Sequence, residues 1–150
     1  MVCRLAASKS ARTFRVNDQI FQNRIARKKI WMSKPKLFIT RRWPRSVEEL
    51  AKEDFDVTLN ERDIPLSVEE MRHALKNYDA ISPTVTDILS AQAFDIENIS
   101  CKILCNYGVG YSHIDLPSAQ KHGICVTNTP DVLSDCTADI AMTLMLMAAR

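Results

Sequence analysis

Hydrophobic and polar positions follow two alternating patterns along most of the chain. From residue 36 onward, short runs of apolar and β-branched residues alternate with longer stretches whose apolar residues recur at helical spacing. The runs that we predict to be strands are 36–40, 55–59, 78–81, 101–105 and 124–127. Because strands that alternate with helices are typical of parallel α/β proteins, we expect a parallel sheet of about five strands.

Two of the predicted helices start at recognisable signals. Ser46 and Ser67 are each followed three residues later by a glutamate, Glu49 and Glu70. This spacing forms a capping box, in which the hydroxyl and the carboxylate each accept a backbone N–H that the helix leaves unpaired. We therefore predict one helix from Ser46 to about residue 53 and a second after Ser67. The apolar stripe of the second helix consists of Val68, Met71 and Leu75.

Two shorter helices are predicted further along the chain. The first covers 86–94, with Ile88, Leu89 and Phe94 facing the core. The second covers 114–121, and Gly123 follows it where a left-handed C-cap is favoured.

The last predicted helix is long and apolar. We expect Asp131 to cap it, and it should run from residue 132 to the end of the chain. Over 140–147 it is apolar on almost every side, which predicts that another surface buries it. We interpret its methionines as packing residues rather than as a functional sulfur patch; they are Met142, Met145 and Met147.

A glycine-bearing turn at 106–110 follows the fourth predicted strand. It contains Gly108 and Gly110, two of the three glycines in the chain. Glycine adopts conformations closed to other residues and lets a ligand approach bare backbone N–H groups. Because ligands of open parallel sheets bind at the carboxyl ends of strands, we predict an anion-binding turn here. A dinucleotide fingerprint is disfavoured, since His113 stands at its third glycine position.

The charge distribution separates the first 31 residues from the rest. The net charge is +2, but residues 1–31 carry eight Lys or Arg and one acid, so residues 32–150 are net −5. The basic segment is typical of a mitochondrial presequence or a nucleic-acid-binding arm, or it is extra translated sequence before a natural start at Met32. The acidic remainder argues against nucleic-acid binding by the folded body. We expect a cytoplasmic protein, or a mitochondrial one if the segment is a presequence.

Cysteine and apolar content restrict the class of protein further. Five cysteines show no CxxC or His-paired spacing, so we predict reduced thiols in an intracellular protein and no metal site; they are Cys3, Cys101, Cys105, Cys125 and Cys136. Cys125 and Cys136 could approach each other near the predicted site, although we expect both to be inert. The longest apolar run, 140–149, is shorter than the roughly 20 residues that a membrane span needs.

Several motifs together resemble a known family. They are 106–115 (NYGVGYSHID), 123–124 (GI), 126–130 (VTNTP) and 137–139 (TAD), with 34–42 (KPKLFITRR) as the opening. In this order they resemble the N-terminal region of the D-isomer-specific 2-hydroxyacid dehydrogenases, the glyoxylate and hydroxypyruvate reductase branch in particular. The resemblance covers about 32–150.

The resemblance implies a domain arrangement. Residues 32–130 would form a flavodoxin-like substrate domain, and 131–150 a crossover helix toward a separate Rossmann domain that binds NAD or NADP. That domain, with its glycine fingerprint, its carboxylate-binding arginine and its acid-paired catalytic histidine, would lie beyond Arg150. The resemblance thus implies no catalytic residue in this chain.

The resemblance also implies a reaction and a substrate site. The reaction is hydride transfer between a nicotinamide and a small 2-oxo or 2-hydroxy acid, in a protein that would be a homodimer at full length. The turn formed by Gly108, Val109 and Gly110 would bind the substrate carboxylate, and Thr137 would lie close to the cofactor. We expect the isolated chain to be inactive. An alternative function is a non-catalytic interaction module that docks its apolar C-terminal helix on a full-length relative.

Other residues near the predicted site have simpler interpretations. His113 is expected to stabilise the turn rather than to act as a general acid. His73 and His122 are expected to be solvated. Arg41 and Arg42 either steer an acidic substrate or form a solvated pair, and the solvated pair is the default expectation.

Overall fold

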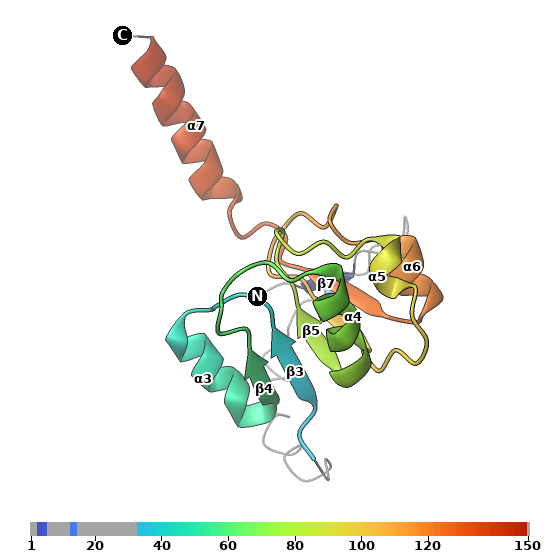
Figure 1. Ribbon diagram of the computed structural model, residues 1–150. Helices are drawn as coiled ribbons and strands as arrows, with labels where there is room; N and C mark the ends of the chain where they lie inside the picture. Colours follow the sequence, from blue (N-terminus) through green and yellow to red (C-terminus); the bar gives the residue numbers. More distant parts are fainter. Residues whose placement is uncertain (1–2, 6–12, 15–32, 150) are drawn as a thin grey trace.

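The computed structural model describes residues 3–5, 13–14 and 33–149, with side chains from residue 33 onward (Figure 1). The strands of its main sheet are β3 (Lys36–Ile39), β4 (Asp56–Leu59), β5 (Ala80–Ser82), β6 (Ile103–Cys105) and β7 (Cys125–Asn128). The helices described are α3 (Arg45–Asp54), α4 (Val68–Asn77), α5 (Ala91–Phe94), α6 (Leu116–Lys121) and α7 (Ser134–Ala148). Each of the five predicted strands is present, with ends that differ by one or two residues.

The five strands form a parallel sheet in the order β4-β3-β5-β6-β7. Numbered along the chain, this order is 2-1-3-4-5, which is the flavodoxin-like arrangement that we expected. Two short strands extend the sheet, because β1 (Cys3–Leu5) pairs antiparallel with β7 and β2 (Thr13–Phe14) pairs with β1. The rest of the basic segment 1–31 lies outside the described residues, so the predictions made for it are not tested.

Helices cover both faces of the sheet. One side chain from each of β5, β6 and β7 lies in a single row across the larger core, where they pack with α4, α5 and α6; they are Ile81, Leu104 and Val126. The opposite face holds a smaller cluster around Leu37, Ile39 and Ala80, against which Ala51 of α3 packs. The alternation of side chains along each strand therefore divides the core into two parts.

The two predicted capping boxes have different outcomes. Ser67 caps α4 as predicted: its hydroxyl accepts the Glu70 N–H, and the Glu70 carboxylate accepts the Ser67 N–H at 2.8 Å. The box predicted at Ser46 is wrong, since α3 begins at Arg45 with Pro44 at the N-cap and no side-chain cap. Instead, the buried carboxylate of Glu48 accepts the Trp43 N–H at 2.9 Å and so bonds α3 to the chain that precedes it.

The helix predicted over 86–94 is mostly wrong. Only α5 is helical there, and Leu89 instead forms a parallel bridge with Ile114. Leu89 and Phe94 are buried as predicted, but the Ile88 side chain is 64% exposed. In place of the first helical turn, the Asp87 N–H donates to the Thr84 carbonyl at 3.0 Å and the Asp87 carboxylate accepts the Thr84 N–H at 2.9 Å, which closes a turn over 84–87.

The helix α6 agrees with the prediction. Asp115 caps it by accepting the Ser118 N–H at 3.3 Å, and Gly123 after it has a φ of +69°. That φ lies in the left-handed region, which glycine enters without steric cost.

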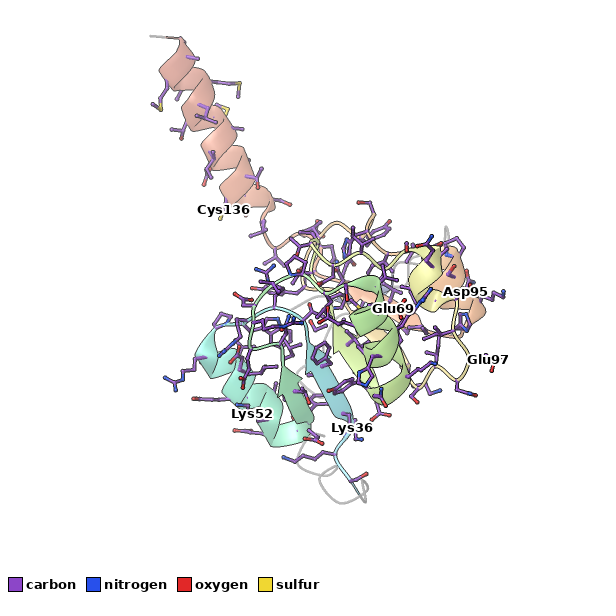
Figure 2. All side chains as sticks on the ribbon, viewed as in Figure 1. Lys36, Lys52, Glu69, Asp95, Glu97 and Cys136 are labelled. Atoms are coloured by element: carbon purple, nitrogen blue, oxygen red, sulfur yellow. The ribbon has the colours of Figure 1, made fainter. Side chains whose placement is uncertain are left out.

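The helix α7 differs in its start and in its surroundings. Asp131 is not its cap, because the helix begins at Ser134 and Asp131 itself has a φ of +63°. Figures 1 and 2 show α7 extending away from the sheet, with Cys136 at its base. Its large apolar side chains are exposed, among them Ile140, Leu144 and Leu146 at 61%, 60% and 66%. The described residues do not supply the covering surface that the apolar pattern predicts.

Candidate functional site

The glycine turn lies at the carboxyl end of β6 and is fastened to both neighbouring strands. On one side the Tyr107 N–H donates to the Pro83 carbonyl at 2.8 Å, just past β5. On the other side the Asn106 N–H donates to the Thr127 carbonyl in β7 at 2.9 Å. The turn is therefore built into the edge of the sheet at which ligands of parallel α/β proteins bind.

The turn adjoins the point where the strand order reverses, between β3 and β5. Val85, in the loop after β5, lies so close to Gly108 that a Cβ on Gly108 would come within 3.3 Å of the Val85 Cγ1. A Cβ on Gly110 would meet nothing within 4 Å. Glycine at 108 thus allows this close packing, while position 110 faces open space.

The predicted reason for the two glycines needs correction. Gly123 is the glycine with a positive φ in the described part of the chain, so neither Gly108 nor Gly110 uses a conformation closed to other residues. The two glycines matter for steric reasons. Gly108 leaves room for Val85, and at Gly110 no side chain covers the backbone. The predicted access to bare N–H groups therefore does not depend on an unusual φ.

Two asparagine side chains hold three consecutive carbonyl groups of the turn. The Asn106 Nδ2 donates to the carbonyl oxygens of Gly108 at 3.1 Å and Gly110 at 2.8 Å. The Asn128 Nδ2 donates to the Val109 carbonyl at 2.8 Å. Sequence analysis did not identify either asparagine, although asparagine beside a turn commonly bonds to nearby backbone.

Fixing these carbonyls also fixes the directions of the N–H groups. The described chain has no cis peptide bond, and in a trans peptide the N–H points opposite to the C=O of the same unit. The N–H groups of Val109, Gly110 and Tyr111 therefore point away from the asparagines. No hydrogen bond from these three N–H groups to any described residue is recorded. Backbone N–H groups of this kind can bind an anion.

His113 contacts the turn, as its predicted stabilising role requires. Its Nε2 lies 3.0 Å from the Asn106 Oδ1. Burial lowers the pKa of His113, because it disfavours the imidazolium, and the negative charge of Asp87 opposes this shift. His73 and His122 are exposed, in agreement with the prediction.

The arginines after β3 both form ion pairs at the surface, with 29% of the Arg41 side chain and 47% of the Arg42 side chain exposed. The Arg41 Nε donates to the Asp63 Oδ1 at 3.0 Å, and its Nη1 donates to the Thr86 hydroxyl at 3.3 Å. The guanidinium of Arg42 donates two hydrogen bonds of 2.9 Å to the carboxylate of Glu48. Both side chains are therefore engaged in fixing loops at the carboxyl edge of the sheet.

A buried carboxylate that sequence analysis missed connects two of these loops. The Asp87 side chain is fully buried, and its Oδ2 accepts the Thr40 hydroxyl at 2.5 Å and the Thr84 N–H at 2.9 Å. Since Thr40 follows β3 and Thr84 follows β5, Asp87 ties together the two sides of the strand-order reversal. Because the apolar spacing over 86–94 favoured a helix, the sequence pattern did not indicate that Asp87 joins two loops.

The remaining predicted residues lie apart from the turn. Thr137 is exposed in the first turn of α7, where its hydroxyl donates to the Leu133 carbonyl at 2.8 Å. Within the described residues, no recorded contact joins Thr137 to the turn. Cys125 lies in β7, whereas Cys136 is exposed on α7.

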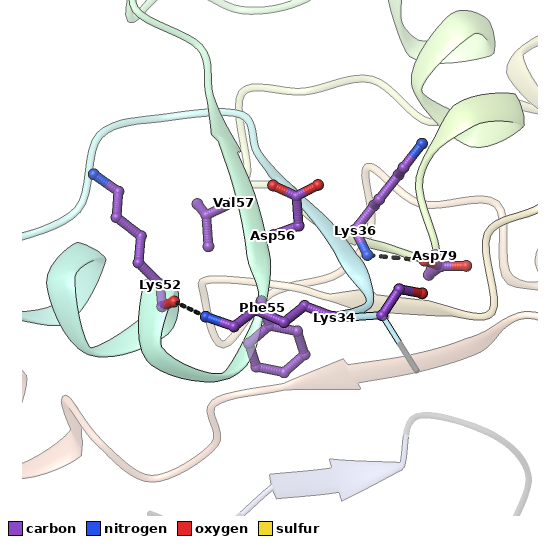
Figure 3. A pocket seen from close by; sticks show the side chains of 8 residues that line it. Lys34, Lys36, Lys52, Phe55, Asp56, Val57 and Asp79 are labelled. Atoms are coloured by element: carbon purple, nitrogen blue, oxygen red, sulfur yellow. Dashed lines mark hydrogen bonds between the residues drawn. The ribbon is translucent and has the colours of Figure 1, made fainter. Parts of the chain in front are cut away.

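A separate depression of about 600 Å³ lies at the amino ends of the strands, at the other end of the sheet from the glycine turn (Figure 3). Lys36 and Asp56, at the amino ends of β3 and β4, are among its lining residues. Figure 3 shows the Lys34 Nζ donating to the Lys52 carbonyl, at 2.8 Å, and the Lys36 N–H donating to Asp79. These interactions fasten the ends of strands, so this depression is not the predicted anion site.

Two further properties concern metal binding and membrane insertion in the described part of the chain. No group of three or more His, Cys, Asp or Glu side chains there is arranged to hold a metal ion. No helix there is both long and apolar enough to cross a membrane.

Comparison with known proteins gives relatives of one kind. The chain is 42% identical over 119 residues to glyoxylate reductase of Thermococcus kodakarensis and 40% identical over 120 residues to that of Pyrococcus horikoshii. Each match covers 78% of this chain and 35% of the relative. The chain therefore spans about a third of the length of these curated relatives.

Solved structures agree. The TT0316 protein of Thermus thermophilus is similar with a TM-score of 0.63 and 30% identity, over 77% of this chain and 37% of that one. A 2-hydroxyacid dehydrogenase of Ketogulonicigenium vulgare is similar with a TM-score of 0.59 and 26% identity, over 77% and 36%.

A family model also matches this chain. Residues 37–144 match the catalytic domain of the D-isomer specific 2-hydroxyacid dehydrogenases. The matched range includes every strand of the parallel sheet except the first residue of β3, and it includes the whole glycine turn. The chain belongs to the family of D-isomer specific 2-hydroxyacid dehydrogenases.

Proposed function

We propose that this chain is the substrate-binding part of an oxidoreductase that uses NAD or NADP to reduce small 2-oxo acids, such as glyoxylate or hydroxypyruvate, to 2-hydroxy acids. The observation that carries the proposal is the orientation of the Val109 and Gly110 N–H groups, whose peptide units have their carbonyls, those of Gly108 and Val109, bonded to Asn106 and Asn128. Such N–H groups can hold the substrate carboxylate without a buried counter-charge. The glyoxylate reductases that the chain resembles support this choice of substrate class.

The chain contributes binding and orientation rather than hydride transfer. The sequence contains no GxGxxG fingerprint, so a nicotinamide nucleotide has no recognisable phosphate-binding turn here. Thr137 is our candidate for a cofactor contact, since its hydroxyl oxygen keeps the capacity to accept a hydrogen bond after donating to Leu133. A nicotinamide, when bound, would supply the hydride, and the turn would hold the carboxylate so that the neighbouring carbonyl carbon is presented for transfer.

The test is a titration of the ¹⁵N-labelled 150-residue chain with glyoxylate, followed by NMR. We expect the Val109 and Gly110 amide signals to move with millimolar affinity, and glycolaldehyde, which lacks the carboxylate, to leave them in place. Unmoved Val109 and Gly110 signals would overturn the proposal. We expect no oxidation of NADH or NADPH by the isolated chain with glyoxylate or hydroxypyruvate; turnover would show that it holds catalytic groups we do not assign.

A second candidate function rests on the exposed apolar side chains of α7. In this alternative the chain is a non-catalytic module that docks α7 on a full-length relative, which we take to be a homodimer. Crosslinking of the chain to an intact glyoxylate reductase, lost when Leu144 is replaced by Glu, would support it. We infer a cytoplasmic location; import of a fluorescent fusion into mitochondria, dependent on residues 1–31, would replace that inference.

A further inference from the structure

Asn106 is a buried amide whose hydrogen-bonding groups are directed at the glycine turn. Its side chain is 2% exposed and lies directly after β6. Two carbonyl oxygens face one end of its amide, so that end must be the NH₂ donor. The other end is then the carbonyl oxygen, and His113 Nε2 must carry a hydrogen to donate to it. The contacts thus define both the amide orientation and the tautomer of His113.

The shared donor has a geometric consequence for the turn. Because the carbonyls of Gly108 and Gly110 converge on one nitrogen atom, the N–H groups of Val109 and Tyr111 both point away from that nitrogen. If either peptide plane rotated by half a turn, a carbonyl oxygen would face the approaching anion and repel it. Asn106 therefore opposes the rotation that would abolish the site.

His113 in turn prevents rotation of the Asn106 amide. If the amide flipped, its NH₂ would face the His113 N–H and its oxygen would face the two carbonyls. All three hydrogen bonds would be lost inside the protein, where leaving polar groups unpaired is strongly unfavourable. His113 is held from its own backbone, because its carbonyl accepts the Leu89 N–H at 2.9 Å.

We propose that Asn106 is a positioning residue for the anion-binding turn, and that His113 keeps its amide in the working orientation. The inference rests on the proposed function, in which the turn binds the substrate carboxylate. Neither side chain touches the substrate in this scheme. Their role is to present the N–H groups of Val109 and its neighbours before the anion arrives.

The test compares Asn106→Asp with the wild-type chain and with the matched control Asn77→Asp. Aspartate has the shape of asparagine but, when ionised, cannot donate to the Gly108 and Gly110 carbonyls. Asn77 is exposed and donates to the His73 carbonyl at 2.8 Å, in α4. We expect at least a tenfold loss of glyoxylate affinity for Asn106→Asp and no loss for Asn77→Asp. The Val109 amide should lose its ligand-induced shift while the amides of β5 to β7 keep their dispersion.

A second pair of variants decides the matter if Asn106→Asp does not fold. His113→Leu removes the donor to Asn106, whereas His113→Asn retains one. Weaker glyoxylate binding by His113→Leu, restored in His113→Asn, supports the inference, and equal affinity of both overturns it. In the wild type, the His113 side-chain ¹⁵N spectrum should show the hydrogen on Nε2.

The outcomes separate the two proposals. If glyoxylate leaves the wild-type Val109 and Gly110 signals unmoved, the proposed function fails before any variant is considered. If the wild type binds and folded Asn106→Asp binds equally well, the function stands and the positioning role of Asn106 is overturned.

Discussion

The glycine turn and α7 are close in sequence but leave opposite kinds of groups uncovered. In the turn the carbonyls are bonded to Asn106 and Asn128, and N–H groups face outward. In α7 the backbone is satisfied within the helix, and apolar side chains such as Leu144 face outward. We expect the turn to bind a small polar ligand and α7 to pack on an apolar surface. The two regions should therefore have different partners.

The energies of the two regions differ accordingly. Burying a leucine or isoleucine side chain stabilises a protein by roughly 1.5–3 kcal/mol, and the described structure does not realise this for the large apolar residues of α7. A helix of 15 residues without such packing is of marginal stability in water. The parallel sheet and its helices, by contrast, bury their own core.

The largest expected effect separates the core from α7. Leu104, in the central row of the sheet, is fully buried, and Leu104→Ala should lower the free energy of unfolding by about 2–5 kcal/mol. Leu144→Ala is the matched control on α7, where the side chain is 60% exposed, and it should change that energy by less than about 0.5 kcal/mol. Urea unfolding measures both. Equal losses would show that α7 packs on the sheet in solution.

A smaller effect is expected at the start of α3. Glu48→Ala removes the acceptor of the Trp43 N–H and of two Arg42 hydrogen bonds, and should cost about 1–2 kcal/mol, since Arg42 is partly exposed. Glu49→Ala, which removes an exposed carboxylate 3.9 Å from Arg45, is the control and should cost less than about 0.5 kcal/mol. Thermal unfolding distinguishes them. Similar losses would contradict the fastening role of Glu48.

The capping box of α4 predicts a dependence on pH. Hydrogen bonds from the Ser67 backbone and hydroxyl, together with Arg62, lower the pKa of Glu70 from its ordinary 4.5 to about 2. Its contribution to stability is therefore complete above pH 4.5 and is lost as the pH falls toward 2. Glu70→Gln should reduce the change in the free energy of unfolding between these two pH values. Glu69→Gln, whose carboxylate lies outside the capping box, should leave that change as it is in the wild type. A wild-type free energy of unfolding that stays constant over this pH range would refute the assignment.

The smallest effect on stability is expected from charges placed on α7. The double variant Leu144→Glu and Met147→Glu should leave the free energy of unfolding within about 0.5 kcal/mol of the wild type, since both side chains are exposed. It should instead reduce concentration-dependent association, because α7 presents apolar side chains to solvent. Analytical ultracentrifugation at two or more concentrations tests this. Unchanged association would show that another surface brings copies together.

The sequence predicted the parallel sheet well because the signal is periodic. Runs of apolar residues identified all five parallel strands, and the capping box at Ser67 and the left-handed Gly123 were confirmed. The errors arose where one side chain overrides a local pattern. Glu48 bonds the start of α3 where Ser46 was expected to cap it, and Asp87 takes part in a turn where a helix was predicted.

The position of the candidate site was predicted from the sequence, but the side chains that orient it were not. The turn between β6 and α6 was identified from Gly108 and Gly110, yet the two asparagines that orient it were missed. One of them, Asn128, belongs to a different strand, so its contact with Val109 depends on tertiary structure that local sequence does not encode. The roles of Gly108, Val109 and Gly110 in substrate binding, and of Thr137 in cofactor binding, stay predictions.

The link between β7 and α7 has a mechanical consequence. Asn128 holds the Val109 carbonyl at 2.8 Å, and the Thr129 N–H donates to the Gly108 carbonyl at 3.1 Å. A few residues later the chain passes through Asp131, in the left-handed region, and enters α7. The segment that leads into α7 is thus the same segment that holds two carbonyls of the turn. A change in the path of the chain between β7 and α7 would therefore act directly on the Gly108 and Val109 carbonyls.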